Sequence, residues 1–180
     1  AKPNEMQRYS VRGNVDQKVN KWLTMGVNVG VTKSAYSGLN SGTNALSGNI
    51  FSAIRQHPNV PIFDPDDPTG YNIDDVNSDY VGRWNNIFSI GDNLPNIMYV
   101  VDHNKYESKV NRIIGNTYAQ LTFTPWLNWK TQLSIDQSTS ESYLFWNPQH
   151  GDGKGYKGYA YNAFYNLLRW NLQNILNFNK

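Results

Sequence analysis

Carboxylates with the chemistry of a metal site gather in one stretch of this 180-residue chain. Asp64, Asp66 and Asp67 are followed closely by Asp74 and Asp75. Calcium takes about six to eight oxygen ligands of this kind. The spacing does not match an EF-hand loop, however, and acidic loops are often simply solvated. Asp64, Asp66 and Asp67 are therefore weak metal candidates, and we expect a solvated loop without a bound metal.

Other motifs of catalytic type are weaker. Residues Gly153 to Gly158, GKGYKG, match G-x-G-x-x-G, but that fingerprint needs a strand before it and a helix after it. His57, His103 and His150 are far apart and form no triad, so ordinary surface or hydrogen-bonded histidines are favoured over ligands. The sequence does not identify a carboxylate pair for glycoside hydrolysis, and no Ser or Lys lies in a recognisable motif for a catalytic nucleophile. We expect no catalytic residue, no enzyme activity and no cofactor.

Composition limits the class of protein. Mean hydropathy is −0.63, and no run of about 18 apolar residues exists that would form a membrane-spanning helix. Strands of a transmembrane β-barrel escape this test, because they need only about 10 residues of alternating hydrophobicity. The Lys and Arg residues are scattered rather than striped, so no nucleic-acid partner is expected.

The elements that must position any site show a period of two. Leu23, Met25, Val27, Val29 and Val31 alternate with small or polar residues. Successive side chains of a strand point to opposite faces, so this pattern predicts a strand with one apolar and one polar face. The preceding run 8–16 alternates in the same way, and 17–21 is polar. The stretch 8–33 therefore predicts a β-hairpin.

Two further segments repeat this design. Residues 112–123 and 127–136 predict a second hairpin that reverses at Thr124-Pro125, and 168–178 predicts a final strand. The expected outward-facing residues of both hairpins are Leu23, Met25, Val27, Val29, Val31, Leu127, Trp129, Leu133 and Ile135. The expected residues of the opposite, wet face are Arg12, Asn28, Asn128, Lys130 and Gln132.

The connections are unequal in length. A loop is expected over 34–49, a short helix over 49–55, irregular chain over 58–79 and another long loop over 138–161, whereas 80–98 stays unassigned. Tight turns on one side and long loops on the other are typical of outer-membrane barrels. The predicted fold is all-β, an antiparallel up-and-down meander that forms a segment of a transmembrane β-barrel with long loops on one side.

Aromatic residues make up 14% of the chain, and each group has two interpretations. Tyr9, Trp126, Trp129 and Trp170 lie near predicted strand ends, which suits an aromatic girdle at a lipid interface, or else the core of a soluble sheet. A second group lies in the predicted last loop and either contacts a ligand or partner, or packs on itself. Its members are Tyr143, Phe145, Trp146, Tyr156, Tyr159 and Tyr161.

Several segments of the sequence resemble one protein family. They are RYSVRGNVDQKVNKWLTMGVNVG, AIRQHPNVPIFDPDDPTGYN, RIIGNTYAQLTFTPWLNWKTQLSID and LLRWNLQNILNFNK. In order, and over nearly the whole chain, they resemble the barrel of SusC/RagA-type TonB-dependent outer-membrane receptors. The resemblance implies a barrel of about 22 strands in a Bacteroidetes-like Gram-negative outer membrane, in contact with lipid. It also implies import of oligosaccharides or peptides, driven through TonB, with a SusD-like surface lipoprotein as partner.

The chain departs from that family in length. It has no plug domain, no TonB-contacting segment and no terminal strand ending in an aromatic residue, and five or six strands cannot close a barrel. Residues 1–180 are therefore expected to be a partial β-barrel segment from the middle of a receptor. The alternative is a soluble β-rich carbohydrate-binding module, in which the same apolar faces pack on each other.

Overall fold

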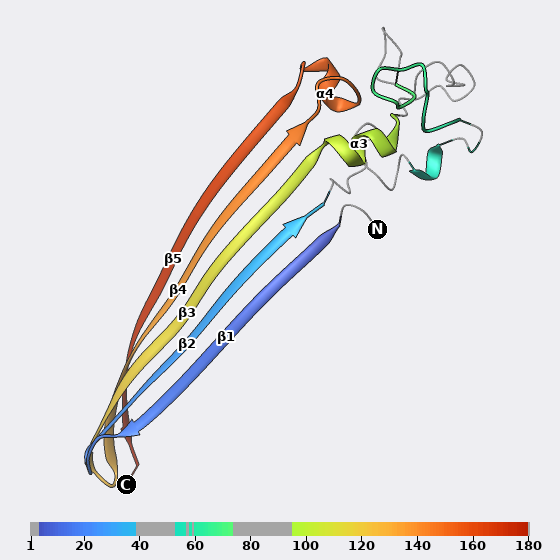
Figure 1. The fold of residues 1–180 in the computed structure, drawn as a ribbon. Helices are drawn as coiled ribbons and strands as arrows, with labels where there is room; N and C mark the ends of the chain where they lie inside the picture. The colour runs from blue at the N-terminus through green and yellow to red at the C-terminus, as the bar shows by residue number, and fades with distance from the viewer. Residues whose placement is uncertain (1–3, 39–52, 57, 59, 74–94, 180) are drawn as a thin grey trace. The chain divides into compact units, whose positions relative to one another are not determined.

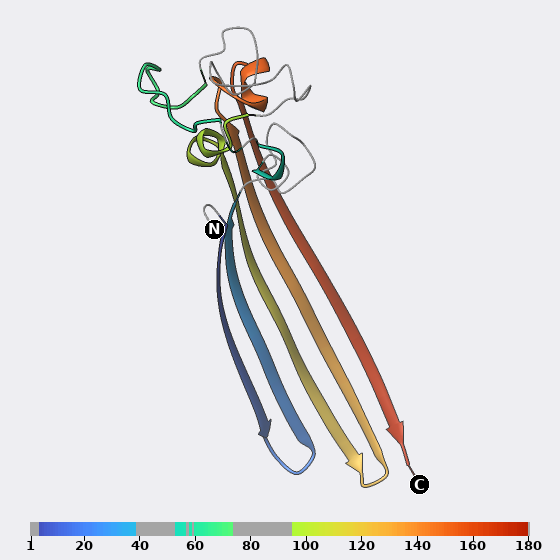
Figure 2. The same ribbon diagram turned by 90° about the vertical axis from the view of Figure 1, so that its right-hand side faces the viewer.

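The computed structural model describes residues 4–38, 53–56, 58, 60–73 and 95–179, and its main element is one five-stranded sheet (Figures 1 and 2). The strands are β1 (Glu5–Lys18), β2 (Leu23–Ser37), β3 (Lys105–Thr124), β4 (Leu127–Trp146) and β5 (Tyr159–Phe178). Their order in the sheet is their order in the chain. The prediction of an all-β antiparallel up-and-down meander is confirmed, and a barrel segment is compatible with it.

The chain divides into two compact units, which are described separately. The loop unit comprises Ala1–Met6, Tyr36–Ser108 and Ser142–Ala163, and the sheet unit comprises Gln7–Ala35, Lys109–Glu141 and Phe164–Lys180. Every strand contributes residues to both units.

In the sheet unit, both predicted hairpins are present. The first turn is closed by Asn20, whose side-chain oxygen accepts hydrogen bonds from the backbone N–H groups of Trp22 and Leu23 at 2.9 and 2.8 Å. This is the local bonding that favours asparagine in turns. The second turn consists of residues 125–126 alone, between β3 and β4. The Trp126 ring meets the Phe178 ring edge-on at 5.4 Å, which places the end of β5 beside this turn.

The strands are longer than the sequence predicted. The predicted loop over 138–161 is wrong, because β4 continues to Trp146 and β5 begins at Tyr159. Likewise β2 extends through Ser37, into the region expected to be loop. Residues 138–142 are Ser, Thr and Glu and carry no apolar alternation, but a neighbouring strand supplies their partners. Ser142 Oγ lies 3.3 Å from Ser108 Oγ of β3, for example. Cross-strand pairing here overrides weak local propensity.

The loop unit holds the described helices. Helix α3 (Ile97–His103) lies in a segment that sequence reasoning left unassigned, and α4 (Asp152–Gly155) is a single turn. Residues 53–55 are helical, whereas the rest of the predicted helix 49–55 lies outside the described residues. None of the helices in the described ranges is both long enough and apolar enough to cross a membrane.

Helix α3 begins at an ordinary capping signal. The Asn96 side chain accepts a hydrogen bond from the Tyr99 backbone N–H at 3.2 Å, which is the role asparagine plays best at a helix N-terminus. Tyr99 and Val100 are completely or almost completely buried. Asn96 after Pro95 is therefore the signal that would have located this helix. The irregular chain expected over 58–79 is observed in its described part, where an isolated bridge joins Phe63 and Tyr71.

Candidate binding surface on the polar face of the sheet

Hydrogen bonds between strands define two faces of the sheet unit. Ser10 pairs with Thr32 at 3.1 Å, Asn28 with Asn116 at 2.7 Å, and Asn177 with Asn128 at 2.9 Å. These side chains therefore share one face, the polar face, formed by the even positions of β1–β4 and the odd positions of β5. Because side chains alternate along a strand, the remaining positions form the opposite, apolar face.

The predicted outward-facing residues all occupy the apolar face, at alternate positions of β2 and β4. Most of them are exposed: Met25, Val27, Val29, Val31, Leu133 and Ile135. Leu23, Leu127 and Trp129 are half-buried. In β2 the usual relation, with apolar side chains buried and the polar side exposed, is inverted. Val27 and Val29 on the apolar face are 47% and 42% exposed, whereas Gly26 on the polar face is buried. Within the described residues, the apolar side of this strand is thus its less covered side.

The same face of β5 is more exposed still. Trp170 is 70% exposed, and Leu168, Leu172, Leu176 and Phe178 are also exposed. Monomeric soluble proteins rarely leave contiguous apolar patches larger than a few hundred Å² in contact with water. A surface of this kind indicates contact with an apolar medium or a partner. Contact with lipid remains a prediction.

Tyr118 organises the polar face near the tight turns. Its hydroxyl donates to Asp16 Oδ1 at 2.7 Å. Lys130 Nζ lies 4.3 Å from the centre of its ring, a cation–π contact. The ring lies across Gly26, where a Cβ would fall 2.7 Å from Tyr118 Cζ and closer still to Tyr118 Cε1 and Asp16 Oδ1. Gly26 is required here because an aromatic side chain from the next strand covers it.

A second group of charges joins β3, β4 and β5. Arg112 donates two hydrogen bonds to the Asp136 carboxylate, Nε to Oδ1 and Nη2 to Oδ2, both at 2.8 Å. Arg169 of β5 also attracts this carboxylate. The pair is partly exposed, so its contribution to stability is at most about 1 kcal/mol. Its geometric effect is larger, because the bidentate contact fixes both side chains across two strands.

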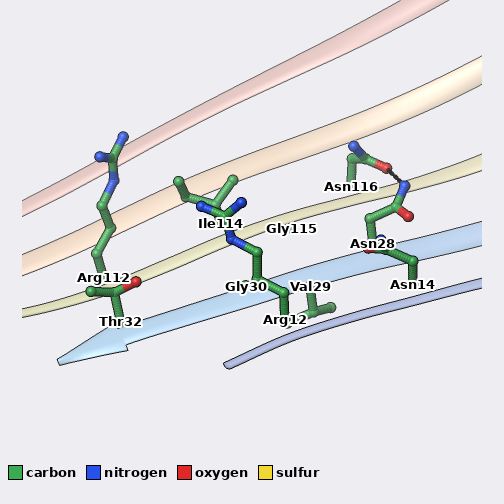
Figure 3. A pocket seen from close by; sticks show the side chains of 10 residues that line it. All are labelled: Arg12, Asn14, Asn28, Val29, Gly30, Thr32, Arg112, Ile114, Gly115 and Asn116. Carbon is green, nitrogen blue, oxygen red and sulfur yellow. Dashed lines mark hydrogen bonds between the residues drawn. The ribbon is translucent and has the colours of Figure 1, made fainter. Parts of the chain in front are cut away.

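Between these two groups the polar face is hollowed. A depression of about 320 Å³ is lined by Arg12, Asn14, Asn28, Val29, Gly30, Thr32, Arg112, Ile114, Gly115 and Asn116 (Figure 3). The structure thus brings Arg12 and Asn28, two of the predicted wet-face residues, into one depression. Asn128, Lys130 and Gln132 lie on the same face of β4, outside it. Alternation over 112–123 sets Arg112 and Asn116 on the polar side of their strand, but the predicted wet-face residues did not include them. Cross-strand pairing brings them beside Arg12 and Asn28.

The predicted aromatic ligand residues are only partly together. Trp146 at the end of β4 lies 4.9 Å from the Tyr159 ring centre, and Tyr156 lies 6.0 Å from Tyr159. Tyr143, Phe145, Trp146, Tyr159 and Tyr161 belong to strands, so their assignment to a loop is wrong, and only Tyr156 lies in the connection. Tyr143 and Phe145 alternate with Trp146 and so point to the other face. Tyr156 and Tyr159 are exposed and Trp146 is half-buried, so this cluster is the part that a ring-shaped ligand can reach.

The metal candidates of the loop unit serve the fold of their own loop. Asp64 Oδ1 accepts from the Asp66 backbone N–H at 3.0 Å, and Asp67 Oδ1 accepts from the backbone N–H and hydroxyl of Thr69. Asp64 and Asp67 are buried, whereas Asp66 is exposed. Across the described ranges, no three His, Asp or Glu side chains are placed to hold a metal ion.

The two described histidines also have structural contacts. His150 is buried, and its Nε2 accepts a hydrogen bond from the Asn96 backbone N–H at 2.7 Å. His103 Nδ1 lies 2.9 Å from the Tyr99 carbonyl oxygen, and its ring stacks on the Tyr99 ring. Burial raises the pKa of the Tyr99 hydroxyl, which lies 2.7 Å from Gln149 Oε1. These contacts join α3 to the 147–150 segment of the loop unit. His57 lies outside the described residues.

The GKGYKG motif does not have the context of a dinucleotide site. It follows an antiparallel strand and overlaps α4, a helix of four residues. Gly153 instead packs against the backbone of Trp146 and Asn147, where a Cβ would clash. Gly158 takes a φ of 97°, a conformation that favours glycine. The glycines therefore shape the β4–β5 connection.

No protein-family model matches the chain, and no curated protein matches it.

Proposed function

We propose that this chain is a segment of the barrel of a SusC/RagA-type outer-membrane transporter that imports glycans or peptides. In this role the apolar face contacts lipid and the polar face lines the transport path. The proposal combines the sequence resemblance with the two-faced sheet. The TonB system, acting through a plug, and a SusD-like lipoprotein are the partners that the proposal includes.

The observation that carries the proposal is the inverted exposure of β2 and β4, whose apolar side is more exposed than their polar side. Val27, Val29 and Leu133 would be sealed in a dry centre if another protein layer covered the apolar face of this chain, yet Leu133 is 37% exposed and the two valines more so. The opposite face carries arginines, asparagines and aspartates joined in networks. An apolar outer band and a polar interior are the pattern of transmembrane barrels.

Strand length and pairing support the same role. Strands β3, β4 and β5 each contain 20 residues, more than the about 9–11 that cross a bilayer. In the described sheet, β1 and β5 each pair with one neighbour. An open strand edge is not tolerated within the hydrocarbon region, so a membrane-embedded form needs further strands at both edges. The rest of the barrel supplies them in the receptor, and other copies of the chain would supply them when the chain is bound to vesicles alone.

A soluble carbohydrate-binding module is the second candidate. The partly exposed cluster of Trp146, Tyr156 and Tyr159 favours it, because aromatic faces can stack on sugar rings. In such a module the apolar face would have to be covered by a second layer or a second copy of the chain. The two candidates therefore differ in what touches Val27 and Trp170.

Detergent dependence separates the two functions. We expect the purified chain to aggregate or oligomerise in buffer, since its apolar face and sheet edges are open, and to become monodisperse in detergent. With phosphatidylcholine vesicles on a density gradient, it should float with the lipid. A monodisperse monomer in buffer that stays at the bottom of the gradient would contradict the membrane role and favour the soluble module.

A further inference from the structure

Arg12 is the charged group of the depression that the surrounding structure leaves unneutralised. Arg112 forms an ion pair with Asp136, and Asp16 accepts a hydrogen bond from the Tyr118 hydroxyl and not from Arg12. The structure records no hydrogen bond or ion pair for Arg12 among the described residues, and it is exposed. A guanidinium that is oriented but unpaired on a polar surface is suited to bidentate binding of a carboxylate.

Gly30 sets the direction of this side chain. A Cβ at position 30 would lie 3.4 Å from Arg12 Cγ and 3.9 Å from Nε, so the arginine lies flat across the glycine. Figure 3 shows Arg12 crossing Gly30 toward Ile114. The Arg12 side chain therefore lies across β2, and its guanidinium is directed over the depression.

Amide groups line the depression beside Arg12. Asn28 Nδ2 donates to Asn116 Oδ1, which fixes the two amides in opposite orientations. The Asn28 oxygen and the Asn116 nitrogen then remain as an acceptor and a donor, and Asn14 and Thr32 add further polar atoms. Alternating donors and acceptors of this type suit the hydroxyl groups of a sugar. A volume of about 320 Å³ is at the small end of ligand sites, which range over about 300–1,000 Å³.

Charge on the polar face of the sheet unit favours an anionic ligand. Its basic side chains are Arg8, Arg12, Lys18, Arg112, Lys130 and Arg169, and its carboxylates are Asp16 and Asp136. A surface lined mainly by one sign of charge attracts ligands of the opposite sign and raises their local concentration.

We infer that Arg12, with Asn28 and Asn116, forms a binding site for the carboxylate of an acidic oligosaccharide, a uronate. Arg12 would bind the carboxylate and the two amides the ring hydroxyls. The inference rests on the proposed function for its place in a transport path, and it names the substrate class of that path. All residues that line the depression belong to the sheet unit.

Titration calorimetry at low salt tests the inference directly. We expect trigalacturonate to bind the chain, in detergent or in buffer as its solubility requires, and neutral maltotriose to bind at least tenfold more weakly. Arg12→Gln should weaken trigalacturonate binding at least tenfold, because a hydrogen bond to a charged group is lost. The affinity of Arg12→Lys for trigalacturonate should lie between those of the unchanged chain and Arg12→Gln. Lysine keeps the charge but not the two parallel N–H donors of the guanidinium.

Arg8→Gln is the matched control, because Arg8 lies on the same strand and face but outside the depression. It should change trigalacturonate affinity less than twofold. Equal affinity for both sugars, or equal effects of Arg8→Gln and Arg12→Gln, would overturn the inference. Tighter binding of triglutamate than of trigalacturonate would overturn it in favour of an acidic peptide. Uronate binding by a chain that fails to float with lipid would leave the site standing and contradict the membrane role.

Discussion

Val27→Arg should abolish stable association of the chain with lipid and lower the stability of the membrane-embedded sheet by up to about 2–4 kcal/mol, the cost that a basic side chain reaches at the bilayer midplane of a barrel. Val27 occupies the apolar face of β2, an interior strand of the sheet, and is exposed there. A cation at this position would have to be desolvated by lipid. Flotation on vesicles and urea unfolding of the lipid-bound protein measure the two effects.

Asn28→Arg is the control for Val27→Arg, because the adjacent residue points to the opposite face. It removes the hydrogen bond to Asn116, which contributes about 1 kcal/mol, but it places the charge on the wet side. Flotation should therefore persist. If both arginine variants floated equally, or if Asn28→Arg alone failed to float, the assignment of the two faces would be wrong.

Gly26→Ala is the second change with a large expected effect. The added methyl group would enter space that the Tyr118 ring and the Asp16 carboxylate already occupy. Overpacking of this kind costs about 1–3 kcal/mol, and displacement of the ring also breaks the 2.7 Å hydrogen bond to Asp16. The midpoint of urea unfolding in detergent should fall accordingly.

Gly13→Ala provides the comparison, since nothing lies within 4 Å of a Cβ at that position. It should be neutral or raise stability by up to about 1 kcal/mol, because alanine restricts the unfolded chain. Combining Gly26→Ala with Tyr118→Ser should recover part of the loss, and the double-mutant cycle measures the coupling. Additive effects of the two substitutions would show that Tyr118 does not cover Gly26.

The sequence located the sheet well wherever apolar residues alternated. The alternating pattern of Leu23 to Val31, of 112–136 and of 168–178 predicted the two hairpins and the final strand. It did so because a period of two is a direct consequence of strand geometry. The same signal failed over 138–146. There the strand consists first of small polar residues, and pairing with β3, not side-chain pattern, maintains the strand.

The candidate site was harder to predict because the register between neighbouring strands decides which side chains meet in it. Arg12 and Asn28 were placed on the wet face by alternation, but nothing local shows that Asn28 meets Asn116, 88 residues away in the chain. Gly26 and Gly30 were the residues that could have indicated the site from the sequence. A glycine inside a strand often marks the close approach of another group, here Tyr118 over Gly26 and Arg12 over Gly30.

The central claim, that the apolar face meets lipid and the polar face meets water, can be tested at two adjacent residues. The chain contains no cysteine, so Val27→Cys and Asn28→Cys each provide one labelling site for a polarity-sensitive fluorophore. With the chain bound to vesicles, the label at position 27 should be quenched by nitroxide lipids and not by aqueous iodide, and the label at position 28 should show the reverse. Iodide quenching at position 27 together with nitroxide-lipid quenching at position 28, or equal quenching at both, would contradict the account.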